Sequence, residues 1–206
     1  MYRKYGNFYY VKCNIKKFFY TIDKDVLFDI LSRNIKDKKL LSLTKTIVYD
    51  LDDTGIPIGN YTSQYFANIY LSELDYYVKN ELKVKFYVRY MDDFVCLVRT
   101  KKEAREVLDA INVFVESVLH LTLNHKSRII PSYRGIDFCG YVMKRDKIYV
   151  RKSFIKRCRK RVKKWHTLYK HDKLNKKKMG ETIQCFRAHA KHSDTIIDEC
   201  IGDLEF

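Results

Sequence analysis

The chain has 206 residues, 46% of them hydrophobic and 15% aromatic, which is enough to bury a core and excludes a disordered protein. Its 41 lysine and arginine residues against 25 acidic residues give a formal charge of +16, which favours nucleic acid over an anionic membrane as partner. The absence of an apolar span or secretory signal, and six cysteines without CxxC pairs, predict a cytoplasmic protein with reduced, buried thiols and no membrane association.

The first quarter of the chain is predicted to hold one strand and two helices. Residues 8–13 are rich in aromatic and β-favouring side chains and predict a strand that ends at Asn14. A helix is expected just after Asp23, a suitable N-cap, because apolar residues recur there at helical spacing. A second helix is expected over residues 38–49, followed by a turn at residues 52–55.

The middle of the chain predicts one long helix and a hairpin. Apolar positions over residues 62–78 recur at helical spacing. Residues 85–90 and 94–98 are two β-type runs at hairpin spacing, so Asp92 and Asp93 are expected at the hairpin tip.

The segment that follows the hairpin completes a mixed architecture. Residues 103–119 have the clearest helical stripe in the chain, and two β runs follow over residues 135–143 and 147–150. This order predicts an α+β fold, with an antiparallel sheet covered by helices on one face.

The C-terminal part of the chain differs sharply in charge. Fourteen basic residues and one acidic residue fall between Arg151 and Lys178, and the apolar positions within this segment keep helical spacing. We expect an amphipathic helix with a basic outer face and a second helix over residues 179–191. The predicted domains are residues 1–151 and a helical domain of residues 152–206.

Asp92 and Asp93 are adjacent carboxylates, and like charges at this distance oppose each other's ionisation unless a cation lies beside them. The pair therefore favours a magnesium site. The alternative is that Asp-Asp is ordinary turn chemistry. The flanking run from Tyr87 to Val95 places the pair between two apolar strands and favours the metal site.

That run resembles the YxDD box of reverse transcriptases, and four further segments are similar to motifs of the same family in the same order. The resemblance is to enzymes of bacterial retroelements, of diversity-generating type with group II intron-like lineages as the close alternative, and covers about residues 8–151. The four other segments are Cys13–Asp23, Ile56–Asn68, Leu121–Ser127 and Gly135–Tyr141.

The resemblance implies a right-hand polymerase palm that adds a dNTP to a DNA or RNA primer on an RNA template. Two Mg²⁺ ions, for which Mn²⁺ can substitute, would be held by Asp92, Asp93 and the residue at position 14. This chain departs from the family there, because Asn14 stands where the first aspartate is expected. An amide offers one neutral oxygen to a hard cation, so we expect near-inactivity. Asp23 is either a substitute ligand or, as we prefer, the cap of the next helix.

The resemblance also assigns residues to the nucleotide. Phe19 falls where an aromatic ring blocks a ribose 2′-hydroxyl, although it is also suited to the core. Lys126 falls where a lysine lies near the leaving pyrophosphate, which implies a catalytic role as general acid, and the alternative is an ordinary surface lysine. Ile58 and Gln64 replace the glutamine and proline that many members carry, which implies weaker nucleotide selection. The predicted nucleotide-binding residues are Ile15, Phe19, Ile58, Gly59 and Gln64.

The basic C-terminal helices resemble the family's thumb. Phosphate contacts are predicted for Lys156, Arg159, Lys163 and Lys164. The family carries a fingers region ahead of the first palm motif, whereas about a dozen residues precede Asn14, so we expect the fingers to be largely absent or supplied by another segment or an accessory protein. The leading hypothesis is an inactive or weakened RNA-directed DNA polymerase core. The alternatives are a non-catalytic, maturase-like RNA-binding module and, more weakly, an interaction scaffold.

Overall fold

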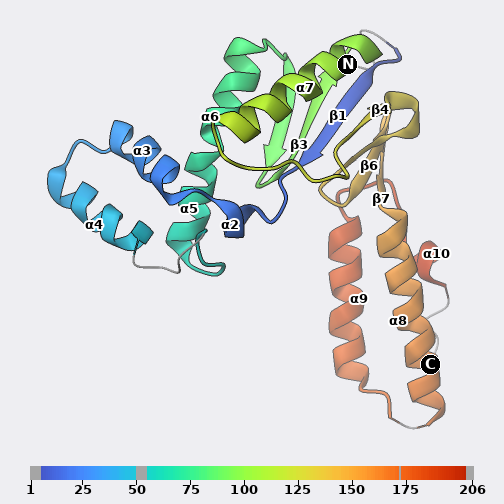
Figure 1. Ribbon diagram of the computed structural model, residues 1–206. Coiled ribbons are helices and arrows are strands. Elements are labelled where there is room, and N and C mark those ends of the chain that lie inside the picture. The colour runs from blue at the N-terminus through green and yellow to red at the C-terminus, as the bar shows by residue number, and fades with distance from the viewer. Residues whose placement is uncertain (1–5, 50–54, 172, 203–206) are drawn as a thin grey trace. The chain divides into compact units, whose positions relative to one another are not determined.

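The computed structural model describes residues 6–49, 55–171 and 173–202, so residues 52–54 of the expected turn lie outside it. The chain divides into two compact units, Met1–Pro131 and Ser132–Phe206, which are described separately (Figure 1). The change in composition at Arg151 falls within the second unit, and the predicted division at residues 151 and 152 stays a prediction.

The first unit is built on an antiparallel sheet of four strands in the order β2-β3-β1-β4. The hairpin and the first strand were expected, but β4 was not, because four residues that end in proline show no alternating pattern. The strands are β1 (Tyr9–Asn14), β2 (Phe86–Tyr90), β3 (Asp93–Val98) and β4 (Arg128–Pro131). Pairing with β1, as in Tyr10 opposite Ile130, holds β4 in the sheet.

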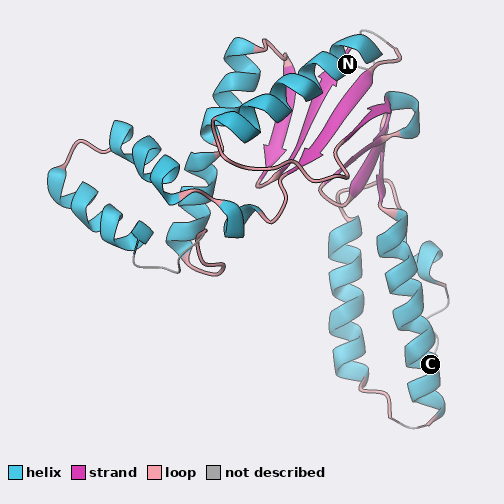
Figure 2. Ribbon diagram, viewed as in Figure 1, coloured by secondary structure: helices cyan, strands magenta, loops and turns pink. Residues whose placement is uncertain are grey.

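Helices cover one face of this sheet (Figures 1 and 2). Val11 lies opposite Cys96 and Cys13 opposite Phe94, and all four side chains belong to the main hydrophobic core. Helix α7 (Lys101–Ser117) packs on this face and begins with a capping box between Thr100 and Glu103. Because side chains alternate along a strand, the residues between these core positions point to the opposite face.

Two helical segments between β1 and β2 match the expectations closely. Asp23 caps α3 (Lys24–Asn34) by accepting hydrogen bonds from the N–H groups of Asp25 and Val26, and α4 (Lys38–Tyr49) packs against α3. A short helix, α2 (Phe18–Thr21), precedes them.

The helix expected over residues 62–78 is interrupted. It consists of α5 (Tyr61–Tyr70), α6 (Ser72–Tyr76) and a π-helical turn at Tyr77–Glu81. At the interruption the Ser72 hydroxyl donates a 2.6 Å hydrogen bond to the Ile69 carbonyl. Such a local side-chain bond competes with the regular helical bond at the same carbonyl.

The described residues of the second unit form a three-stranded antiparallel sheet, a 3-10 turn at Ser132–Arg134 and three α-helices. The β run expected over residues 135–143 is divided by a turn in which Cys139 and Gly140 both have positive φ. The strands, in the order β5-β6-β7, are β5 (Ile136–Phe138), β6 (Tyr141–Lys144) and β7 (Lys147–Val150), and the helices are α8 (Lys152–Lys170), α9 (Lys176–Ala190) and α10 (Ile197–Ile201). Val150, Cys158, Val162 and Trp165 belong to a separate core of this unit.

All six cysteines are free, but they are not all buried as expected. Cys13, Cys96 and Cys158 lie in the cores, whereas Cys139 and Cys185 are exposed. Cys139 is exposed because it forms the β5–β6 turn, and Cys185 because it lies on the outer face of α9. Within the described ranges, no helix is both long enough and apolar enough to span a membrane.

Candidate active site and nucleic-acid interface

The pairing of β1 with β3 brings together the residues that the sequence marks for catalysis. Asn14 lies directly opposite Asp93, so their side chains share the sheet face opposite the main core. Lys12 is two residues before Asn14 on the same strand and therefore shares that face.

Asp92 lies in the tight turn between β2 and β3, where Met91 has a φ of 54°. Nδ2 of Asn14 donates a hydrogen bond of 2.9 Å to Oδ2 of Asp92. The backbone repeats the contact, because Ile15 N–H donates to the Asp92 carbonyl at 3.2 Å. The structure thus places Asn14 in contact with the turn that carries both aspartates.

The carboxylate of Asp93 has a cationic neighbour that the sequence analysis missed. Nζ of Lys12 lies 3.7 Å from Oδ2 of Asp93, and both side chains are largely buried, with 19% and 25% exposed. The alternation of β1 put Lys12 on the same face as Asn14, which was the only signal in the sequence. Lys12 therefore supplies positive charge where a metal ion was expected.

The residues present do not complete the expected metal site. Among the described residues, no three or more of His, Cys, Asp and Glu are grouped so that they could hold a metal ion. Asp92 and Asp93 offer two carboxylates, but the Asn14 amide already donates to Asp92 and the Lys12 ammonium lies beside Asp93. Magnesium prefers several charged oxygens in octahedral geometry, so this donor set does not fit a pair of Mg²⁺ ions as it stands.

The loop after α7 runs alongside Asn14. Asn124 N–H donates to the Asn14 carbonyl at 2.7 Å, and Asn14 N–H donates to Oγ of Ser127 at 3.4 Å. Lys126 lies in this loop, where its N–H donates to Oδ1 of Asn124 and its side chain is exposed. The loop is thus next to the carboxylates, and the role of the Lys126 ammonium stays a prediction.

Asp23 is a structural residue in this arrangement. Besides capping α3, its Oδ2 lies 2.8 Å from Nδ1 of His120. Burial acts to raise the pKa of the Asp23 carboxyl, but the hydrogen bonds from His120 and the backbone outweigh it and lower the pKa. Of the two readings left open for Asp23, the structure supports the helix cap.

The predicted nucleotide-binding residues fall into two environments. The side chain of Ile15 is in the core, out of reach of a nucleotide, and its N–H donates to the Asp92 carbonyl. Phe19 is half-buried and meets the Phe18 ring edge-on, with centroids 5.6 Å apart. Ile58 is 63% exposed, and Gly59 and Gln64 are also exposed; Ile58 and Gly59 lie just before α5, and Gln64 lies in its first turn.

Gly55 allows the start of the segment Ile56–Asn68 to approach the backbone of Phe19. The Ile56 N–H donates to the Phe19 carbonyl at 2.8 Å. Gly55 has a φ of +70°, and a Cβ at this position would lie 2.4 Å from that same carbonyl oxygen. Only glycine permits both this conformation and this approach.

A second residue that the sequence analysis missed is Arg89 on β2. Its Nε and Nη2 donate to the two carboxylate oxygens of Asp75 at 2.8 and 2.6 Å, and its Nη1 donates to the Met91 carbonyl at 3.1 Å. Arg89 therefore ties the turn that carries Asp92 to helix α6. A bidentate arginine contact of this kind fixes geometry as well as charge.

The basic face predicted on α8 is present on its outer side. The side chains of Lys156, Arg159, Lys163 and Lys164 are all exposed, while Cys158, Val162 and Trp165 face the core. Arg159 is partly engaged, because its Nε donates to the Cys200 carbonyl at 2.5 Å. Lys156, Lys163 and Lys164 are therefore better candidates for phosphate contacts than Arg159.

The chain matches one family profile and is similar to several curated proteins. The sequence profile described as "Reverse transcriptase (RNA-dependent DNA polymerase)" matches residues 2–143. The chain is 34% identical over 116 residues to the Retron Ec73 reverse transcriptase of Escherichia coli, covering 50% of this chain and 36% of that protein. It is 23% identical over 209 residues to the putative COX1/OXI3 intron 2 protein of Saccharomyces cerevisiae, covering 69% of this chain and 24% of that protein.

Solved structures show a similar fold. Apo telomerase from Candida tropicalis, truncated from its C-terminal domain, superposes with a TM-score of 0.59 at 15% identity and covers 70% of this chain and 36% of that one. Telomerase from the same organism, in complex with the TWJ fragment of telomeric RNA, superposes with a TM-score of 0.58 at 12% identity, over 76% and 33% of the two chains. The chain thus spans about a quarter to a third of the length of these relatives.

Proposed function

The chain belongs to the reverse transcriptase family, and we propose that it is the palm and thumb of an RNA-directed DNA polymerase whose catalytic centre is incomplete. Residues 1–151 would be the palm and residues 152–206 the thumb. The protein would bind an RNA template with a DNA or RNA primer and extend the primer weakly or not at all.

The observation that carries this proposal is the hydrogen bond from Nδ2 of Asn14 to Oδ2 of Asp92. The position next to the two aspartates is held by a neutral amide, which donates to a carboxylate instead of sharing a cation with it. Removing one charged ligand from a two-metal centre costs several kcal/mol of transition-state stabilisation, which corresponds to a rate lower by on the order of a thousandfold or more.

The remaining residues have roles in this proposal that depend on a bound nucleotide. Phe19 would face the sugar, Ile58, Gly59 and Gln64 would lie beside the base and template, and Lys126 would approach the phosphates. The exposure of Ile58, Gly59, Gln64 and Lys126 supports these roles, because a ligand can reach them.

A second candidate function is a non-catalytic RNA-binding module. The contact between Lys12 and Asp93 favours it. The Lys12 ammonium stabilises the negative charge of the partly buried Asp93 carboxylate, so no metal ion is needed to do so. The sheet face and the basic helix α8 would then serve only to hold RNA.

One experiment tests the proposal and separates the two candidates. The chain should bind an RNA template annealed to a DNA primer, while primer extension with Mg²⁺ stays near background. With Mn²⁺, which tolerates irregular coordination better, a weakened polymerase should show measurable extension. Binding without extension under either ion would favour the non-catalytic module, and failure to bind the template would exclude both.

A further inference from the structure

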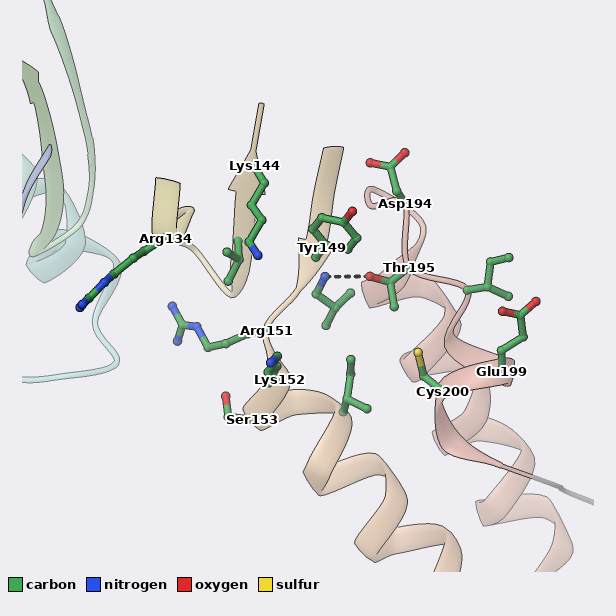
Figure 3. Close-up of a pocket in the computed structure, with 14 residues that line it drawn as sticks. Arg134, Lys144, Tyr149, Arg151, Lys152, Ser153, Asp194, Thr195, Glu199 and Cys200 are labelled. Atoms are coloured by element: carbon green, nitrogen blue, oxygen red, sulfur yellow. Dashed lines mark hydrogen bonds between the residues drawn. The ribbon is translucent and has the colours of Figure 1, made fainter. Parts of the chain in front are cut away.

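The second unit contains a cavity of about 890 Å³ that none of the roles above uses (Figure 3). It lies between the β6–β7 hairpin, the first turn of α8 and the segment 194–200. Its volume falls within the usual range of small-ligand sites, which is about 300–1,000 Å³.

The walls of this cavity are held by specific bonds. Oδ2 of Asp194 accepts a hydrogen bond from Ile148 N–H at 2.6 Å, and Asp194 N–H donates to the Ile148 carbonyl at 2.7 Å. Oγ1 of Thr195 accepts a hydrogen bond from Val150 N–H at 2.9 Å. A dashed line at Thr195 marks this bond in Figure 3. The segment 194–200 is thereby fixed to β7, so the cavity is a built feature.

The other wall depends on a glycine. A Cβ at Gly135 would lie 2.6 Å from Cγ1 of Val142 and 3.0 Å from Cγ of Lys144. Both of these side chains line the cavity, so a larger residue at position 135 would displace them.

The interior has an apolar floor with an aromatic ring. Val142 and Tyr149 are cross-strand partners on one face of the small sheet, and Ile155 and Ile196 add apolar surface from other segments. Tyr149 is 38% exposed, so a flat ligand can reach its ring. Stacking on such a ring is a common way to bind a nucleobase.

Charged groups stand on opposite sides of this floor. Lys144 and Lys152 lie on one side of Tyr149 and Glu199 lies on the other, each from a different element (Figure 3). A nucleotide fits this arrangement, because its phosphate suits the lysines, its base suits the apolar floor, and its amino group can donate to the carboxylate. An acidic peptide would have its negative charges near Glu199, and a purely apolar ligand would not use the lysines.

We infer that the cavity receives one unpaired nucleotide of an RNA strand whose phosphates follow helix α8. The helix supports an RNA source, because Lys152 at the cavity and Lys156 and Lys163 beyond it are all exposed and recur on one side of α8. The inference rests on the proposed function, since it assumes that the chain holds RNA.

The test compares three RNA hairpins that share one stem: fully paired, with a single bulged adenosine, and with an abasic bulge. Affinities are measured by fluorescence anisotropy for the whole chain. The bulged adenosine should bind at least about fivefold more tightly than the other two, which is the lower end of the effect of stacking one base. Millimolar AMP should reduce this preference, whereas ribose 5-phosphate should not.

Matched substitutions locate the effect. Tyr149→Ser and Glu199→Gln should each reduce the preference for the bulged adenosine and leave binding of the paired hairpin unchanged. Lys144→Gln should weaken binding of the bulged hairpin more than that of the paired one. The controls are Tyr133→Ser, an exposed tyrosine outside the cavity, and Lys147→Gln, the cross-strand partner of Lys144. Melting curves check that each variant is folded.

Three results would overturn the inference: equal affinity for the three hairpins, a preference that survives Tyr149→Ser, or competition by ribose 5-phosphate as strong as that by AMP. The last would mean that the cavity binds only phosphate. If no hairpin binds at all, the proposed function fails as well. Salt-dependent binding of the paired hairpin without any bulge preference would leave that function intact and reject only this site.

Discussion

The Asn14 amide donates its hydrogen bond to Asp92 across 78 positions of the sequence, at the point where a catalytic carboxylate of the family is expected. This contact satisfies Asp92 with a neutral partner. The hydrogen bond from Ile15 N–H to the Asp92 carbonyl also keeps position 14 beside Asp92.

The first prediction is that Asn14→Asp increases magnesium affinity and raises primer extension by on the order of a thousandfold or more, because it restores an anionic ligand. The measurement is extension of a DNA primer on an RNA template, with the chain alone and with the fingers segment of a relative joined ahead of it. Asn14→Asp combined with Asp92→Asn is the control and should return extension to background. If Asn14→Asp gives no more extension than the parent in either form, Asn14 is not the cause of inactivity.

The second prediction concerns the basic face of α8. The plot of log affinity against log salt has a negative slope. Charge reversal of Lys156, Lys163 and Lys164 should make this slope shallower by about three, since each phosphate contact contributes roughly −0.9. Adding Arg159 should make the slope shallower by less than one further unit, because its guanidinium also contacts the Cys200 carbonyl.

The matched control for α8 reverses the same number of charges on α4, at Lys38, Lys39 and Lys45, which are also exposed. The titration uses an RNA–DNA duplex at several salt concentrations. A slope that changes equally in both variants would mean that only net charge matters and that α8 makes no specific phosphate contacts.

The third prediction follows from the pair of Asp23 and His120. The pKa of Asp23 is lowered in the folded state, so its contribution to stability is complete above the unfolded value of about 3.9 and is lost as the pH falls through the folded value. Asp23→Asn keeps an N-cap acceptor but removes the charge. Its melting temperature should therefore be below that of the parent at pH 6, and the gap should close below about pH 4.

Two further variants separate the cap from the histidine contact. Asp23→Ala also removes the cap and should cost about 1 kcal/mol more than Asp23→Asn. Asp23→Asn combined with His120→Ala should cost less than the sum of the two single substitutions, because both remove the same contact. Strict additivity in thermal melts would show that the two side chains are not coupled.

The fourth prediction compares two glycines. Gly55→Ala should destabilise the first unit by more than 1 kcal/mol, because the residue has positive φ and its Cβ would overlap the Phe19 carbonyl. Gly180→Ala is the matched control: it lies within α9 with nothing within 4 Å of a Cβ, and should stabilise the protein by about 0.5–1 kcal/mol. Equal effects in chemical denaturation would contradict the close approach at Gly55.

The sequence by itself determined the features that depend on neighbouring residues. Asp23 was recognisable as a cap because its partners, Asp25 and Val26, are two and three residues away. The place of Asp92 at a hairpin tip followed from the two short β runs beside it. The family also followed from the sequence, because its motifs are short local patterns, and the profile match over residues 2–143 confirms it.

Only the tertiary structure decided the contacts that depend on strand register. Nothing near Lys12 in the sequence indicates Asp93, and the pairing of β4 with β1 joins segments more than 100 residues apart. The separation of the strands into two sheets, and the hydrogen bonds of Asp194 and Thr195 to β7, also depend on contacts between segments that are distant in the sequence. Register is set by which apolar face can be buried against the helices, and that choice involves the whole chain. The family resemblance predicts a carboxylate at position 14, where the sequence has Asn14, and the fold places Asn14 against Asp92 and Lys12 beside Asp93.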